Sequence, residues 1–226
     1  MMNKAWIRKS ILRMRYKIIS CFTGVDITLD PKNGASLINK EYVDYQHSYT
    51  YYVERVMRRF EITAADSILD YGSGKGGMLI FFSKYNFGKI EGVELMPELD
   101  GTAKKNIAGK KLKNVKTYLV DAAKYEDIDI YNYFYFNNPF SGDTLKSVVE
   151  QIKRSLMRHK RKITIIYQNP QGRELFIQSG MFLCVKFYFV PSFINRDINN
   201  IRYGRQFIDV YCTEQIKINS ATGHKN

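Results

Sequence analysis

The sequence predicts an α/β fold with three layers, in which helices cover both faces of a mostly parallel sheet of seven strands. Five apolar, β-rich runs predict the parallel strands, at residues 67–71, 89–94, 116–120, 131–137 and 162–168. Helical patterns alternate with these runs, at residues 76–85, 97–108, 142–158 and 171–178. This alternation indicates parallel βαβ units joined by right-handed crossovers. Two further runs, at residues 181–190 and 206–213, have no clear helical pattern between them, so we expect the sheet to end in an antiparallel hairpin.

The first sixty residues differ in character from the rest of the chain. Residues 1–60 are expected to form a basic helix and a lid segment, ahead of a sheet domain over residues 61–226. Residues 1–22 contain six lysines and arginines, and no acid precedes Asp26. Apolar side chains are interleaved with these cations at roughly helical spacing. Such a helix either lies on an anionic membrane surface or docks on its own domain through its apolar stripe. A second helix is expected over residues 48–60.

Composition narrows the classes of partner and of site. The formal net charge of +13 favours an anionic partner, namely nucleic acid, an acidic glycan or lipid intermediate, or a membrane surface, although a solvated lysine-rich surface explains it equally. The three scattered cysteines form no CxxC pair, so neither a disulfide framework nor a metal site is expected. No apolar run is long enough to span a bilayer. We expect a cytoplasmic location, with peripheral membrane contact through residues 1–22 left open; the oligomeric state is not predicted.

A glycine loop follows the first predicted strand. The segment Ser67-Ile-Leu-Asp-Tyr-Gly-Ser-Gly-Lys-Gly76 has glycine at alternate positions, which lets the backbone turn tightly and approach a ligand. Glu94 ends the next strand, where a carboxylate suits a ribose hydroxyl pair. The glycines also satisfy the dinucleotide pattern G-x-G-x-x-G. However, Asp70 would repel a pyrophosphate at this position and would favour a ligand that carries an amino group and a sulfonium.

These residues resemble the first motif of the class I S-adenosylmethionine-dependent methyltransferases, an acid followed by G-x-G-x-G. The resemblance implies a Rossmann-like sandwich whose seven-stranded sheet ends in an antiparallel hairpin, with S-adenosyl-L-methionine as cofactor. It also implies that Asp70 and the loop hold the methionine end, that Glu94 binds the ribose, and that Asp121 and the Ala122 N–H meet the adenine. Asp121 is alternatively a turn or capping residue. The complete set of expected cofactor-binding residues is Asp70, Gly72, Ser73, Gly74, Gly76, Glu94, Leu95, Asp121, Ala122 and Asn137.

The second motif is Tyr133-Phe-Tyr-Phe-Asn-Asn-Pro-Phe140, which leaves the fourth strand. It resembles the [D/N/S]-P-P-[Y/F] loop of amino-group methyltransferases, with Asn138 in place of the first proline. The resemblance implies catalytic roles for Asn137, Asn138, Pro139 and Phe140, in which Asn137 accepts a hydrogen bond from the substrate amine and Phe140 forms an aromatic wall. A plain turn is the alternative.

Two groups of proteins share these motifs with the chain. Over roughly residues 24–190 the sequence is similar to small bacterial methyltransferase-like proteins with an Asn-Pro-Phe motif, which also carry a later segment like Ile166-Tyr-Gln-Asn-Pro170. A more distant similarity is to the histone-lysine methyltransferases without a SET domain.

The predicted function is therefore methyl transfer from S-adenosylmethionine to an unidentified acceptor, with nitrogen favoured. Tyr167, His47 and Tyr49 are further candidates for contact with the nucleophile. An arginine group in the loop before the last strand is expected on the catalytic rim, where it would receive an anionic substrate: Arg196, Arg202 and Arg205. The lysine and arginine clusters at residues 104–113 and 153–162 are expected at the opposite edge of the sheet as solvated helix ends. The alternatives are an NAD-dependent oxidoreductase and a non-catalytic methyltransferase-like module that binds nucleic acid or membrane.

Overall fold

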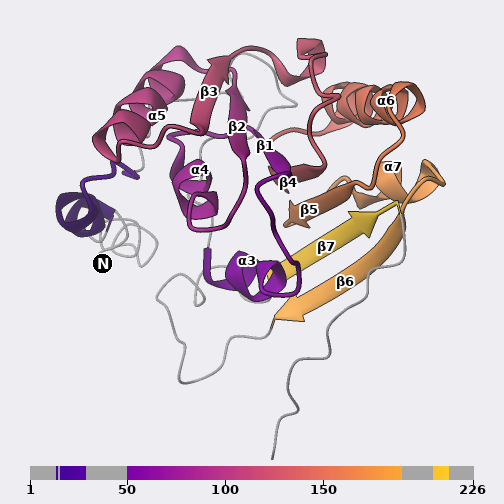
Figure 1. Cartoon of the computed structure of the whole chain (residues 1–226), viewed down its shortest axis with the longest axis horizontal. Coiled ribbons are helices and arrows are strands. Elements are labelled where there is room, and N and C mark those ends of the chain that lie inside the picture. The colour runs from indigo at the N-terminus through magenta and orange to yellow at the C-terminus, as the bar shows by residue number, and fades with distance from the viewer. Residues whose placement is uncertain (1–13, 15, 29–49, 190–205, 214–226) are drawn as a thin grey trace, which may run out of the picture.

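A computed structural model describes residues 14, 16–28, 50–189 and 206–213. Its centre is a sheet of seven strands in the order β3-β2-β1-β4-β5-β7-β6 (Figure 1). The strands are β1 (Ser67–Tyr71), β2 (Lys89–Glu94), β3 (Val115–Leu119), β4 (Tyr133–Asn137), β5 (Thr164–Gln168), β6 (Leu183–Phe189) and β7 (Gln206–Cys212). The helices of residues 50–178 are α3 (Thr50–Met57), α4 (Gly77–Phe82), α5 (Pro97–Gly109), α6 (Gly142–Arg158) and α7 (Arg173–Gln178). A short 3-10 helix, η1 (Ala122–Lys124), was not expected.

The predicted antiparallel pair at the end of the sheet is confirmed, and the structure shows which of its two strands joins the rest of the sheet. β7 pairs antiparallel with both β5 and β6, so the last strand inserts between its two neighbours. All other pairs in the sheet are parallel. The carboxyl ends of β1, β2, β4 and β5 consequently meet at one edge, which is where open α/β sheets bind their ligands.

Residues of β4 alternate between two hydrophobic cores, one on each face of the sheet. Tyr133 and Tyr135 face the core that α3, α4 and α5 cover. Phe134 and Phe136 face the core that α6 and α7 cover. Side chains of a strand point alternately to opposite faces, so an entirely apolar run such as this one suits a strand buried on both sides. Figure 1 shows α4 and α5 on one side of β1 and β4, and α6 and α7 on the other.

The helix near the N-terminus docks on the domain. Its described part comprises residue 14 and residues 16–23. Tyr16, Val25 and Ile27 are buried and pack together, with Ile80 of α4 against them. Of the two arrangements considered for this helix, its described residues show the one in which the helix packs on its own domain. No helix among the described residues is long and apolar enough to cross a membrane.

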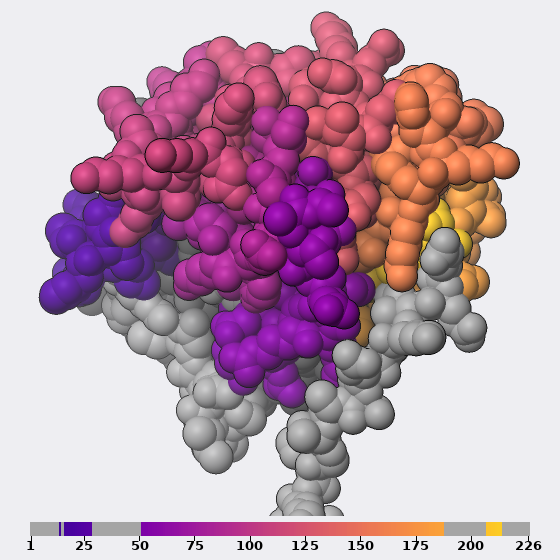
Figure 2. All heavy atoms as spheres, in the orientation of Figure 1, coloured from indigo at the N-terminus to yellow at the C-terminus, as the bar shows by residue number. Residues whose placement is uncertain are grey.

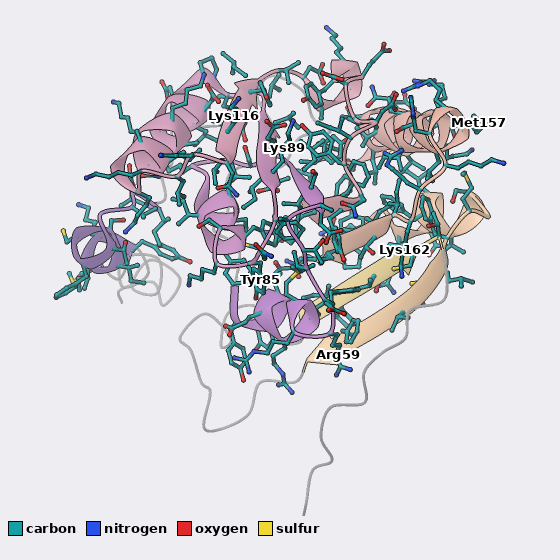
Figure 3. The ribbon with its side chains drawn as sticks, viewed as in Figure 1. Arg59, Tyr85, Lys89, Lys116, Met157 and Lys162 are labelled. Carbon is teal, nitrogen blue, oxygen red and sulfur yellow. The ribbon has the colours of Figure 1, made fainter. Side chains whose placement is uncertain are left out.

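Several members of the two basic clusters have protein partners, although they were expected to be solvated. Lys104 lies 2.7 Å from the Asp100 carboxylate, and Arg158 lies 2.9 Å from that of Asp129. Lys162, two residues before β5, is exposed as expected (Figure 3). Arg161, by contrast, is not a solvated helix-end residue as expected. Its guanidinium donates to the carbonyls of Tyr131 at 2.7 Å, Ile128 at 3.1 Å and His159 at 3.0 Å. It therefore ties the end of α6 to the start of β4, which is a structural role.

Candidate functional site

The glycine loop begins directly after β1. Gly72, Gly74 and Gly76 have φ angles of 73°, 55° and 76°, in the left-handed region that side chains with a Cβ rarely adopt. A Cβ on Gly72 would lie 2.5 Å from the Cβ of Pro139. The loop after β4 therefore packs on the loop after β1. The two motifs that the sequence singled out are adjacent in space.

Glu94 ties the end of β2 to this loop. Its Oε2 accepts the Gly74 N–H at 2.8 Å, and its Oε1 accepts the Met96 N–H at 2.8 Å. Burial raises the pKa of Glu94, although these N–H donors act in the opposite direction. Each carboxylate oxygen has two lone pairs, so both can accept a further hydrogen bond from a ligand hydroxyl.

Asp70 is a buried carboxylate, only 3% exposed, near a second one. Burial first, and then the charge of Glu94, raise the pKa of Asp70 well above its ordinary value. Among the described residues no donor is hydrogen-bonded to its side chain. A buried carboxylate without a cationic partner is unfavourable, and a positively charged ligand group at this place would relieve the cost. A phosphate would increase it.

Other expected cofactor residues have structural partners. The Ser73 hydroxyl lies 3.4 Å from that of Thr117 in β3, so this side chain points back into the domain. Asp121 lies two residues after β3, and its Oδ1 caps η1 by accepting the Ala123 N–H at 2.9 Å. The capping role left open for Asp121 is thus present. Ala122 is buried, and Leu95 is half-buried against the core on the α6 side.

The loop after β4 is held by the loop after β5. Asn137 Oδ1 accepts from Asn169 Nδ2 at 3.0 Å. Asn138 Oδ1 accepts from the Tyr167 hydroxyl at 3.3 Å. Asn138 and Asn169 both have positive φ, 48° and 53°, and each precedes a proline. Two neighbouring strands therefore end in the same Asn-Pro turn, and the second turn orients the polar side chain of the first.

Phe140 lies inside the core. Its ring is 1% exposed and contacts Tyr71 and Phe136 edge-on, with ring centroids 6.2 Å and 6.3 Å apart. In this arrangement Phe140 anchors the loop, while Pro139 is the residue that contacts the glycine loop.

Gln168 was missed by the sequence analysis. It ends β5, pairs in register with Asn137 and is fully buried. Its Oε1 accepts from the Tyr135 hydroxyl at 2.5 Å, but its Nε2 has no hydrogen-bond partner among the described residues. By the alternation of the strands, Asp70, Asn137 and Gln168 point to the same face at the carboxyl ends of β1, β4 and β5. A polar row thus lines the site on the α3 and α4 side. In the sequence, only the Asn-Pro pair that follows β5, which repeats the pair after β4, indicated that the loop after β5 belongs to the site.

Lys75, inside the glycine loop, points away from the polar row. Its Nζ lies 3.4 Å from the Asp26 carboxylate and 3.2 Å from Thr28 Oγ1, and the side chain is buried. Asn106 of α5 donates to the carbonyls of Lys75 at 2.8 Å and of Asp26 at 3.0 Å. Residues 26–28 and Asn106 therefore stabilise the glycine loop on the side away from the polar row.

Several expected residues fall outside the described part of the chain. They are His47 and Tyr49 of the lid segment, and Arg196, Arg202 and Arg205 of the loop before β7.

Solved structures with a similar fold include methyltransferases, although searches with the sequence match no family model and no curated protein. A methyltransferase from Pyrococcus furiosus aligns with a TM-score of 0.58 over 92% of this chain and 98% of its own, at 12% identity. A SAM-dependent methyltransferase from Aquifex aeolicus aligns with a TM-score of 0.53 over 71% and 89%, at 15% identity. Geranyl diphosphate methyltransferase in complex with GPP and sinefungin aligns with a TM-score of 0.55 over 73% and 79%, at 13% identity. The chain therefore has the Rossmann-like fold of the class I S-adenosylmethionine-dependent methyltransferases.

Proposed function

We propose that this protein transfers a methyl group from S-adenosylmethionine to a nitrogen acceptor. The observation that carries the proposal is the buried Asp70 carboxylate beside a glycine loop with three positive φ angles, at the carboxyl edge of this fold. A ligand with a cationic amino-acid end fits that carboxylate, and the backbone without Cβ atoms leaves room for close approach. Solved proteins of the same fold support this choice, among them a SAM-dependent methyltransferase and methyltransferases in complex with S-adenosylhomocysteine or sinefungin.

The residues divide between the two ends of the cofactor. Asp70 would hold the ammonium group, and the remaining lone pairs of Glu94 would accept from the ribose hydroxyls. Leu95, Asp121 and Ala122 would border the adenine. The bound cofactor supplies an electrophilic methyl group on a sulfonium. A dinucleotide would instead bring a pyrophosphate toward Asp70 and Glu94, which Coulomb repulsion opposes.

Asn137 would orient the acceptor. Asn169 donates to the Asn137 Oδ1 and so fixes the direction of the amide, whose oxygen would accept from a substrate amine. Direct displacement by a neutral amine needs proximity and alignment more than a strong base. The anionic body of a substrate would be received by Arg196, Arg202 and Arg205, if these residues lie on the rim as the topology predicts.

Asn137→Ala should lower methyl transfer about ten- to hundredfold without weakening cofactor binding, because it removes a contact made only to the acceptor. Asn169→Ala should have the same effect in weaker form, since it frees the Asn137 side chain. Tritiated methyl transfer into an extract of the source cells measures the first quantity, and calorimetry with S-adenosylhomocysteine the second. Gln171→Ala, an exposed change in the same loop as Asn169, is the control. Loss of cofactor affinity in Asn137→Ala would assign Asn137 to the cofactor pocket instead.

The affinity for S-adenosylhomocysteine should rise with pH through the raised pKa of Asp70. Only the ionised carboxylate attracts the ligand ammonium group, and burial keeps Asp70 protonated to higher pH than an exposed aspartate. Asp70→Asn should remove this part of the pH dependence and bind weakly throughout. Dissociation constants measured for both proteins over a pH series test this. Profiles that run parallel would show that Asp70 does not contact the ligand charge.

A further inference from the structure

The N-terminal helix carries an apolar stripe that faces away from the domain. Met14, Ile18 and Phe22 are 65%, 51% and 88% exposed. Residues four apart lie on one side of a helix, so these three side chains form a single line. Isolated exposed apolar residues are ordinary on protein surfaces, whereas three in line on one helix suit an apolar partner.

The opposite side of this helix is fixed to the domain, so the stripe cannot turn inward. Tyr16 is buried in a cluster with Val25 and Ile27, and Ile80 of α4 packs against this cluster. The Ser20 hydroxyl accepts the Ile27 N–H at 3.1 Å. Lys110 Nζ donates to the carbonyl of Thr23 at 2.6 Å. The fold therefore presents the stripe outward on a docked helix, at the edge of the molecule beside α5 (Figure 2).

Positive charge lies beside this helix. The contact of Lys110 with Thr23 brings the lysine-rich end of α5 beside the helix. The exposed lysines of this region are Lys104, Lys105, Lys110, Lys111 and Lys113. Lys17 is exposed on the helix itself, and the sequence before Asp26 contains no acid. Exposed apolar side chains on a helix with lysines on it and next to it match the surface of a membrane that contains anionic lipids.

We propose that Met14, Ile18 and Phe22 insert into the interface of an anionic membrane while the α5 lysines contact its headgroups. The stripe distinguishes this partner from nucleic acid, because aliphatic side chains such as Met14 and Ile18 contribute nothing to contact with a phosphate backbone. The proposal is independent of the methyltransferase activity. It would place the catalytic domain at a lipid surface.

The test is cosedimentation of the full chain with vesicles of equal parts phosphatidylcholine and phosphatidylglycerol. The double variant Ile18→Ser, Phe22→Ser should bind the vesicles at least about tenfold more weakly, because two apolar side chains no longer move out of water into the membrane. The double variant Met157→Ser, Ile130→Ser removes side chains that are 68% and 50% exposed elsewhere and should bind like the original chain. Figure 3 shows Met157 far from the helix. Circular dichroism verifies that both variants are folded.

A second readout uses Cys21, which is exposed between Ile18 and Phe22. Cys184 is half-buried and Cys212 is buried, and burial raises the pKa of both thiols, so an environment-sensitive thiol label reacts first at Cys21. Its emission should shift to the blue with the anionic vesicles and stay unchanged with phosphatidylcholine alone.

Three results would overturn the proposal. The first is vesicle binding that the Ile18→Ser, Phe22→Ser variant retains, since charge alone would then explain it. The second is a label at Cys21 that stays in water on bound vesicles. The third is no vesicle binding at low salt, whether or not an RNA oligonucleotide binds in its place.

Discussion

Gly72→Ala should destabilise the folded protein by about 2–4 kcal/mol and abolish measurable cofactor binding. The residue has a φ of 73°, and holding an L-residue in the left-handed region costs roughly 1–2 kcal/mol. The new Cβ would also lie 2.5 Å from Pro139 Cβ, so the two loops that form the site would have to separate. Thermal unfolding measures the first effect and calorimetry with S-adenosylhomocysteine the second.

Gly101→Ala is the matched control for this change. Gly101 lies inside α5, and a Cβ there meets no atom within 4 Å. Alanine in a helix interior is favoured over glycine by about 0.8–1.0 kcal/mol, so this variant should be slightly more stable and bind normally. If the two alanine variants behaved alike, the tight contact between the glycine loop and Pro139 would be wrong.

Glu94→Gln should weaken binding of S-adenosylhomocysteine roughly ten- to hundredfold. The carboxylate accepts the N–H groups of Gly74 and Met96 through its two oxygens, and an amide can accept only one of them. The other donor then faces an NH2 group, and a charge-assisted hydrogen bond worth about 1.5–3 kcal/mol is lost. The ribose contact weakens as well, because a neutral amide is a poorer acceptor.

The control for Glu94→Gln is Glu98→Gln, an exposed carboxylate in the first turn of α5. It removes the same charge four residues away and should leave affinity unchanged. Equal losses in both variants would show that the long-range field, and not the hydrogen bonds to the loop, determines binding.

Local patterns predicted most of the fold because the forces that set each element are local. The bounds of β1, β2 and α6 coincide with the predicted ranges, since apolar periodicity and glycine mark their ends. The insertion of β7 between β5 and β6 was not predicted, because only long-range pairing specifies which strand of a hairpin joins the sheet.

In the candidate site, too, local patterns predict some features and long-range contacts determine the others. The placement of Asp70, Glu94 and the loop glycines at one edge could be predicted, because the carboxyl ends of parallel strands in this fold converge there. The contacts of Lys75 with Asp26 and of Asn169 with Asn137 span 49 and 32 residues, and no local pattern encodes them. Gln168 Nε2 has no hydrogen-bond partner among the described residues. Such a feature depends on which residues pack around the amide, and only the folded chain specifies them.

Calorimetry of the purified chain with S-adenosylhomocysteine and with NAD tests the central claim most directly. Asp70 and Glu94 together favour a ligand with a cationic amino-acid end and a free ribose. We expect S-adenosylhomocysteine to bind with a dissociation constant on the order of micromolar, and NAD to give no heat of binding at the same concentrations. Binding of NAD without binding of S-adenosylhomocysteine would contradict the assignment of the site.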